Sequence, residues 1–556
     1  MMVNRILLLV FLFFVNPCWA QEGYATFDRV WDLVEEKFYD PNLNGLDSEA
    51  IRTEARTALE GVDDPEEVAR IINGYLEKLN ASHTRLFTNR EPDYYELLDV
   101  FFFGSYQKQI RPLFDGEPHY HGILVHEVDG KIVDVVPGGP AAQAGLQKDD
   151  RIVQADGHPY HPINSFKDKV GQSVRLQVSR GDATVDIVVQ PEDIYPKKAF
   201  LRSIEASARV IPGEVYDVAY VRMWSYAGEA YHDRLKELLT GRLGEADGLL
   251  LDLRGRWGGA QPQYLELFAP TPRLRFTAQD GEESETEGSL WNKPVGLLVD
   301  STVSSGKEVL AAAFRKNQLG PVIGERTQGS LLGGSLHLLP DGYALYLATV
   351  DVHVDGQRLE GLGVGPSDPA DNPTPVEASR YLTLDMMKRD LAWRADLDQS
   401  ARLKNSPHMS AIDQENTEWA KRVVEAYGWP THSLVGEESA HLFWLLVQHT
   451  PDSEFQEMCL TLMTEAAKAR QASRTDLAYL YDRVQMYNKK PQKFGTQLIG
   501  VKEGGFKLWV VEDPEELDNR RKELELPPIR EYLKHFQLET YQSLDEVMTN
   551  EHWSDW

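Results

Sequence analysis

The sequence predicts an α+β chain of several domains: a helical N-terminal region, a β-rich domain, an α/β core and a helical C-terminal domain. Apolar residues recur at helical spacing near both ends, short strands and Gly/Pro turns follow residue 104, and strands alternate with helices after residue 196. The chain has 556 residues, which is enough for roughly three or four domains with separate cores. Its 42% hydrophobic and 26% charged content is that of an ordinary globular protein.

The formal net charge is -29 at pH 7. Such an excess of acidic groups repels phosphate backbones and anionic headgroups. Nucleic acids and anionic lipid surfaces are therefore excluded as main partners.

Residues 1–20 are typical of a secretory signal. Arg5 supplies the positive charge, Ile6–Val15 is an apolar stretch too short to span a bilayer, and Cys18-Trp-Ala20 fits a cleavage site. The Asn-Pro pair before Cys18 is unfavourable for a lipoprotein anchor. We therefore expect export to the periplasm or beyond, and no membrane span in the mature chain. Cleavage would leave Cys459 as the single thiol, so no internal disulfide is expected.

Residues 21–103 are predicted to be helical. Two apolar sets have helical spacing, Phe27/Val30/Trp31/Val34/Phe38 and Ile71/Ile72/Tyr75/Leu79. A turn that carries Ser82 and His83 follows the second set.

Residues 104–195 are predicted to be β-rich. His121–Val125 and Lys131–Val136 have strand composition, and Pro137–Leu146 is a Gly/Pro turn with a short helix. With Asp149–Gly157, this order resembles a PDZ domain. The resemblance implies capture of peptide C-termini by strand addition. Its carboxylate-binding loop would contain Gly122, Ile123 and Leu124. The alternative is a β-rich spacer that binds nothing.

Residues 196–375 are predicted to form the α/β core, with strands at 216–221, 248–254 and 295–300 and an amphipathic helix near 231–239. Residues 376–410 are charged, polar and flanked by prolines, which favours a linker. Residues 411–556 are predicted to be a helical domain.

Two serines follow the apolar strand Val295–Asp300. The residues from Glu308 onward are strong helix formers, so Ser304 and Ser305 lie at a strand-to-helix junction. Helix N-terminal N–H groups there favour developing negative charge, as a nucleophile requires. The alternative is an ordinary N-cap serine.

A Gly-rich turn, Leu251-Asp-Leu-Arg-Gly-Arg-Trp-Gly-Gly-Ala260, leaves the preceding strand. Its backbone N–H groups could supply half of an oxyanion hole, although a simple tight turn would have the same composition.

Four motifs in order, Asp252-Leu-Arg-x-x-x-Gly-Gly, Ser305-Gly-Lys-Glu, Gly324–Gly329 and Glu360–Pro366, resemble the tail-specific (C-terminal processing) serine peptidases, across about residues 24–370. The resemblance implies a ClpP/crotonase-like core. The processing branch of this family has a lysine 25 residues after its nucleophile, where this chain has Ser330. Lys307 lies too close to Ser305 in sequence to replace that lysine easily.

The tricorn-type branch uses a Ser-His-Ser-Glu tetrad instead. The resemblance to it implies Ser305 as nucleophile, His83 as general base, and Ser82 and Glu360 as the groups that orient and polarise the imidazole. Ser304 is a competing hydroxyl. The oxyanion would be bound by the N–H groups of Gly258 and Gly306.

These residues predict an exported serine endopeptidase that acts on unfolded or C-terminally presented polypeptides. The alternatives are an inactive peptide- or ligand-binding protein on the same fold and a small-molecule esterase or amidase. No cofactor or metal is expected, because no His/Cys cluster has ligand spacing.

Residues 411–556 resemble a bacterial domain family of unknown function on segments such as Tyr479–Val484 and Phe494–Gln497. Its polar residues in apolar contexts either line a site or make internal hydrogen bonds. They are His449, Asp482, Arg483 and Gln497. A protein partner through this domain is an expectation, and the oligomeric state is left open.

Overall fold

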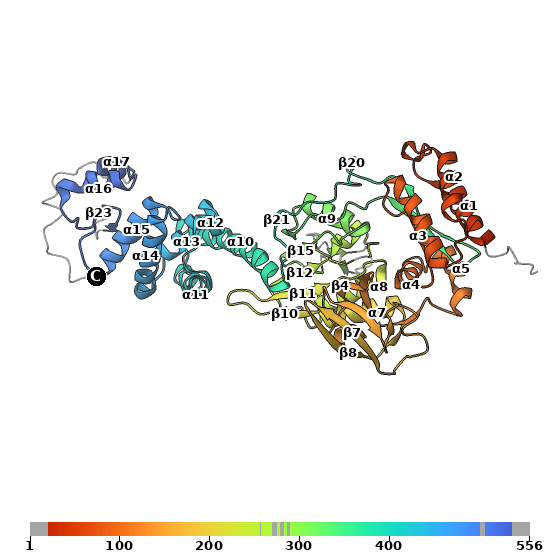
Figure 1. Ribbon diagram of the computed structural model, residues 1–556. Helices are drawn as coiled ribbons and strands as arrows, with labels where there is room; N and C mark the ends of the chain where they lie inside the picture. The colour runs from red at the N-terminus through yellow and green to blue at the C-terminus, as the bar shows by residue number, and fades with distance from the viewer. Residues whose placement is uncertain are drawn as a thin grey trace, which may run out of the picture. The chain divides into compact units, whose positions relative to one another are not determined.

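The computed structural model describes residues 20–255, 257–268, 275–277, 283–285, 290–500 and 506–535 (Figure 1). It divides into two compact units, one of Met1–Val210, Ala219–Glu245 and Leu249–Ala378, the other of Ile211–Val218, Ala246–Gly248 and Ser379–Trp556. The mixed α+β organisation is confirmed. Residues 1–19 of the expected signal lie outside the described residues. In the described part of the chain, no helix has both the length and the apolar character needed to cross a bilayer.

The N-terminal region is helical, as predicted. Its elements are α1 Ala20–Lys37, η1 Leu43–Gly45, α2 Ser48–Ala58, α3 Pro65–Leu76, η2 Glu77–Leu79, β1 Arg85–Phe87, α4 Pro92–Val100 and α5 Gly104–Phe114. Phe27, Val30 and Trp31 are fully buried in one core with Leu345 and Leu347 of the later strand β18. Strand β1 pairs antiparallel with β18, so the turn carrying Ser82 and His83 is anchored to the later strand at 344–350.

The β-rich domain contains β2 Tyr120–Gly122, β3 Val125–Val128, β4 Lys131–Val135, α6 Pro140–Ala144, β5 Arg151–Ala155, β6 His158–Pro159, β7 Val174–Arg180, β8 Ala183–Val189 and β9 Glu192–Ile194. Its main sheet has the order β3-β4-β5-β7-β8. The expected start at residue 104 is wrong, because α5 is helical. Tyr106, Ile110 and Phe114 recur every four residues, and Ile110 is buried, so this segment turns one face inward.

The core sheet has the order β10-β11-β12-β15-β16-β21. The core elements are α7 Pro196–Ser207, β10 Arg209–Ile211, β11 Val218–Arg222, α8 Glu229–Thr240, β12 Gly248–Asp252, η3 Pro262–Leu267, β13 Arg275–Thr277, β14 Glu283–Glu285, β15 Val295–Val299, α9 Gly306–Lys316, β16 Val322–Gly324, β17 Gly333–Leu338, β18 Ala344–Val350, β19 His353–Val354, β20 Gln357–Arg358 and β21 Asp368–Pro369. Strands β12, β15 and β16 run parallel, and β12 and β15 are buried along their whole length. The Gly-rich turn and the serine junction therefore leave the same edge of the sheet, where α/β folds bind ligands.

The second unit is mostly helical. Its C-terminal elements are α10 Pro375–Leu403, α11 Met409–Tyr427, α12 His432–Val435, α13 Glu437–Gln448, α14 Ser453–Lys468, α15 Arg474–Tyr487, β22 Leu498–Gly500, β23 Phe506–Leu508, η4 Pro514–Glu516, α16 Leu517–Glu523 and α17 Ile529–Lys534. The linker expected at 376–410 is wrong, because α10 is one helix of 29 residues. Ala378, Leu382 and Met386 are buried at a spacing of four, and Pro375 occupies the first turn, where proline is tolerated.

Two polar residues that the sequence singled out in this unit make internal hydrogen bonds. The buried Asp482 carboxylate accepts from the backbone N–H groups of Lys493 (2.7 Å), Phe494 (3.0 Å) and Thr496 (3.0 Å). The Gln497 N–H donates to the Gln492 side chain at 2.8 Å. These bonds organise the segment from 492 to 497, which supports the internal hydrogen-bond interpretation.

The other two residues make different contacts. His449 Nδ1 lies 2.9 Å from the buried Asp398 carboxylate. The Arg483 guanidinium lies 5.9 Å from the ring centroid of Tyr487. Neither contact alone defines a binding site.

Asp482→Ala is expected to destabilise the second unit by about 3 kcal/mol or more, because three buried N–H donors lose their acceptor. Urea unfolding with hydrogen exchange read over 474–500 would detect the loss. Glu425→Ala, which removes an exposed carboxylate of α11, is the control. Equal stability of the two variants would contradict the structural role of Asp482.

Candidate active site

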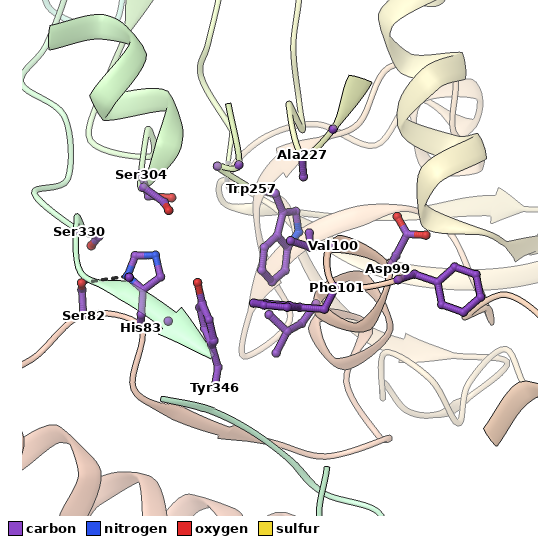
Figure 2. A pocket seen from close by; sticks show the side chains of 18 of the residues that line it. Ser82, His83, Asp99, Val100, Phe101, Ala227, Trp257, Ser304, Ser330 and Tyr346 are labelled. Carbon is purple, nitrogen blue, oxygen red and sulfur yellow. Dashed lines mark hydrogen bonds between the residues drawn. The ribbon is translucent and has the colours of Figure 1, made fainter. Parts of the chain in front are cut away.

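A cavity of about 1130 Å³ opens in the first unit at the edge of the sheet where β12 and β15 end. Its lining brings together the pair Ser82–His83, the turn Trp257–Gly259 and the pair Ser304–Ser305 (Figure 2). The structure thus places in one cavity the predicted nucleophile, the predicted base and one predicted oxyanion donor. Glu360 and Gly306 are not among the lining residues. Each adjoins one that is, since Glu360 accepts a hydrogen bond from Ser82 and Gly306 follows Ser305 in sequence.

Ser82 joins His83 to Glu360. Its hydroxyl lies 2.9 Å from His83 Nδ1 and donates to Glu360 Oε2 at 2.9 Å. The Ser82 backbone N–H donates to Glu360 Oε1, also at 2.9 Å. Glu360 Oε2 accepts further bonds from the Leu331 N–H (2.7 Å) and the Leu332 N–H (3.2 Å). Glu360 therefore reaches the imidazole through Ser82 and is fixed in place by three backbone donors.

His83 is held in an apolar setting. Its φ is 55°, in the left-handed region, and its ring meets Tyr346 edge-on with centroids 5.0 Å apart. Burial lowers the pKa of His83 to about 4, and the nearby charge of Glu360 partly opposes this. His83 is therefore neutral at physiological pH, as a general base must be.

Ser305 occupies the N-cap position of α9 with φ 57° and ψ -132°. Ordinary N-cap residues have β-region dihedrals, and an L-residue rarely adopts the conformation seen here. Its backbone N–H donates to the Ser330 carbonyl at 2.8 Å. In nucleophile elbows, a strained serine occupies a sharp turn between a strand and a helix, and this turn exposes the serine hydroxyl. This geometry favours the nucleophile over the ordinary N-cap interpretation.

Ser304 lines the same cavity, and Figure 2 shows it on the opposite side of the His83 ring from Ser82. Both hydroxyls of the junction thus belong to the site. The backbone strain is at Ser305, which makes Ser305 the better candidate.

The sequence interpretation missed Glu308. Its buried carboxylate accepts from Thr327 Oγ1 (2.6 Å) and from the N–H groups of Gly329 (2.7 Å), Ser330 (2.8 Å) and Ser305 (3.1 Å). Burial raises the pKa of Glu308, and these hydrogen bonds offset part of the rise. Glu308 ties the segment 327–330 to the serine junction. The pattern Ser-x-x-Glu, a capping-box signature, could have revealed it.

Because Gly258 and Gly306 have no Cβ atom, the backbone of the Gly-rich turn can pack against the backbone of the serine junction. A Cβ atom on Gly258 would lie 2.6 Å from the Ser305 Cβ and 2.7 Å from the Ser304 carbonyl oxygen. A Cβ atom on Gly306 would lie 2.5 Å from the Ala260 carbonyl oxygen. The Gly-rich turn therefore packs directly on the serine junction, and a role of its N–H groups as oxyanion donors stays a prediction.

In the described part of the chain, neither position 330 nor Lys307 supplies the lysine base of the processing branch. Ser330 lines the cavity at the position where the processing branch has lysine. Lys307 is fully buried outside the cavity lining, and its Nζ donates to the carbonyls of Trp224 (2.9 Å) and Gly255 (3.4 Å). Burial, together with the positive charge of Arg222, lowers the pKa of Lys307 to about 7. Lys307 fastens the start of the Gly-rich turn to α9.

The predicted peptide-binding residues of the β-rich domain lie outside this cavity. Gly122 pairs with Glu192 between β2 and β9, while the side chains of Ile123 and Leu124 are buried. The adjacent strand β3 is at the edge of its sheet. An edge strand is the kind of surface that strand addition uses, and peptide binding there stays a prediction.

Known families account for the same segments. Residues 20–77 match the tricorn protease C1 domain, 131–180 a PDZ domain, 217–368 peptidase family S41, and 383–543 a family of unknown function (DUF6624). The chain therefore carries a PDZ domain and an S41 peptidase domain, in the order that the sequence interpretation gave.

Two relatives are distant in sequence. The "Putative tricorn protease homolog 2" of Streptomyces coelicolor is 24% identical over 402 residues, which is 67% of this chain and 32% of that protein. The "Carboxyl-terminal-processing protease" of Synechocystis sp. is 24% identical over 387 residues, 65% of this chain and 86% of that protein. This chain thus spans about a third of the first relative's length and most of the second's.

Among solved structures, the photosystem II D1 C-terminal processing protease is 20% identical with a TM-score of 0.39, covering 64% of this chain and 96% of that one. The peptidase family match and the processing-protease relatives indicate a serine-type peptidase.

Gly258→Ala is expected to lower kcat/KM by about 10²-fold or more, since the new methyl group would displace the turn from Ser305. Peptide hydrolysis and circular dichroism would be measured together. Gly74→Ala is the matched control, because a Cβ there meets no atom within 4 Å. Full activity of Gly258→Ala would contradict the close packing of turn and junction.

Proposed function

We propose that this chain, whose residues 217–368 form an S41 peptidase domain, is an exported serine endopeptidase that cleaves unfolded or C-terminally presented polypeptides. The substrate class rests on the PDZ domain and on relatives named as carboxyl-terminal-processing proteases. Export rests on the signal-like residues 1–20.

One observation carries the chemistry: the hydrogen-bond chain from Glu360 through Ser82 to His83, beside the strained Ser305. A carboxylate accepts hydrogen bonds only, so the Ser82 hydroxyl proton points to Glu360. The Ser82 oxygen then accepts a hydrogen bond from the N–H at His83 Nδ1. The imidazole consequently keeps its lone pair on Nε2, where it can receive the Ser305 proton.

The reaction follows from this tautomer. Ser305 Oγ attacks the peptide carbonyl carbon while its proton passes to His83 Nε2. The N–H groups of Gly258 and Gly306 receive the oxyanion, and Ser82 and Glu360 stabilise the imidazolium. The amine leaves with the proton from His83. Water, deprotonated by His83, then releases the acyl group from Ser305.

A fluorophosphonate probe is expected to label the wild type and Ser304→Ala but not Ser305→Ala, and to label His83→Ala more slowly, because the probe reports an activated serine. In-gel labelling and cleavage of an unfolded protein substrate would be scored together. A wild type that neither labels nor cleaves would disprove the peptidase assignment. Loss of labelling in Ser304→Ala alone would move the nucleophile by one residue.

The acid limb of kcat/KM is expected near pH 4 rather than near 6.5. The folded pKa of His83 lies below its usual value, so the neutral base persists as pH falls and is lost only near pH 4. Hydrolysis of one peptide would be measured from pH 3.5 to 8, with circular dichroism confirming that the fold persists. A limb at 6.5 in folded protein would show that the imidazole of the working enzyme is not buried.

A further inference from the structure

The cavity extends beyond the catalytic groups. Asp99, at the end of α4, lines it. In Figure 2, Trp257 and Phe101 lie between Asp99 and the pair formed by His83 and Ser304. Asp99 and Ser305 line the same cavity, so the path from a peptide at Ser305 to Asp99 passes the rings of Trp257 and Phe101.

Asp99 differs from Arg85 and Glu117 of the lining, and it resembles Lys197 and Glu229, which line the same cavity and also form no ion pair in the described part of the chain. The Asp99 carboxylate accepts no hydrogen bond and forms no ion pair within the described part of the chain. Arg85 is held by Glu91 (2.6 Å) and Asp93 (3.4 Å), and Glu117 by Lys198 (2.8 Å). The unpaired carboxylate is only partly exposed, so it lacks full hydration as well.

The walls near Asp99 are apolar. Leu97, Val100, Phe101 and Tyr231 line the same cavity, and Leu97 and Tyr231 are almost fully buried. Apolar and aromatic walls suit a methylene chain, and an aromatic face also attracts a cation. A carboxylate beyond such walls complements a lysine or arginine side chain.

We propose that Asp99 binds an ammonium or guanidinium group of the substrate, so that the enzyme prefers polypeptides with lysine or arginine at one fixed position from the cleaved bond. This inference rests on the proposed peptidase function and names its substrate class. Asp99 acts here as a specificity residue and takes no part in bond breaking.

The charges around Asp99 give this subsite a pH dependence. Burial raises the pKa of Asp99 to about 7, Lys197 of α7 opposes the rise and Glu117 adds to it. The charge of Asp99 also contributes to raising the pKa of Tyr231 of α8, where burial is the larger cause. Since Asp99 is ionised above pH 7, cation preference should be stronger at pH 8 than at pH 6.

The test begins with wild-type digestion of reduced, carboxymethylated casein and mass-spectrometric mapping of its cleavage sites. Internally quenched peptides would then carry lysine or norleucine at the position the map indicates. We expect lysine to raise kcat/KM about tenfold or more at pH 8 in the wild type. The ratio should fall toward one in Asp99→Asn and persist in Asp63→Asn, which removes an exposed carboxylate outside the cavity lining.

Binding to Ser305→Ala, measured by calorimetry with the same peptides, tests the subsite without catalysis. Acetylating the peptide N-terminus separates a side-chain cation from a terminal amine: the proposal requires that lysine preference survive acetylation. Cleavage without any lysine or arginine preference overturns the inference and leaves the peptidase function intact. Failure of the serine probe overturns the function, and equal binding of lysine and norleucine peptides overturns the subsite.

Discussion

The active site depends on one long-range contact, the carboxylate of Glu360 with Ser82 across 278 positions of sequence. Two bonds from Ser82 hold that carboxylate, and both require the N-terminal helical region to be folded onto the core. The same contact fixes the proton on His83 Nδ1. Folding of the N-terminal region and basicity at Nε2 are consequently one event, and the base does not exist in a chain where this region is detached.

A second constraint is the close approach of backbones at Gly258 and the serine junction. Lys307 donates to the carbonyl of Gly255 in the Gly-rich turn and to that of Trp224 after β11, and Glu308 holds the segment 327–330 through three groups. These two residues follow Ser305 by only two and three positions. The first turn of α9 therefore fastens both neighbouring segments, which is how a strained serine can be kept in place.

Local pattern predicted the elements well. The apolar spacing at Phe27 to Val34 predicted α1 and its buried face, and the run before Asp300 predicted the buried strand β15. Helix α10 was missed because charged residues between its buried positions hid a spacing of four. Helix α5 was missed for a different reason, because Gly104 at its start and Pro112 inside it are residue types common in turns.

Side-chain partners were less accessible to prediction. The positions of Ser82, His83 and Glu360 came from family resemblance, since no periodicity indicates that residues 278 positions apart share a hydrogen bond. The sequence interpretation did not single out Asp99, and it considered Lys307 only as a replacement for the missing lysine base. A sequence shows that a residue is charged but not whether its partner is present, and it is the missing partner that gives Asp99 its interest.

Burial acts in opposite directions on the two ionisable groups that matter in the cavity. It disfavours the charged form of each, so the pKa of His83 falls to about 4 and that of Asp99 rises to about 7. Between these values the base is neutral and ready while Asp99 is largely protonated. Only above pH 7 is the cavity both basic at His83 and anionic at Asp99. One apolar enclosure thus separates the pH range of catalysis from the narrower range of cation selection.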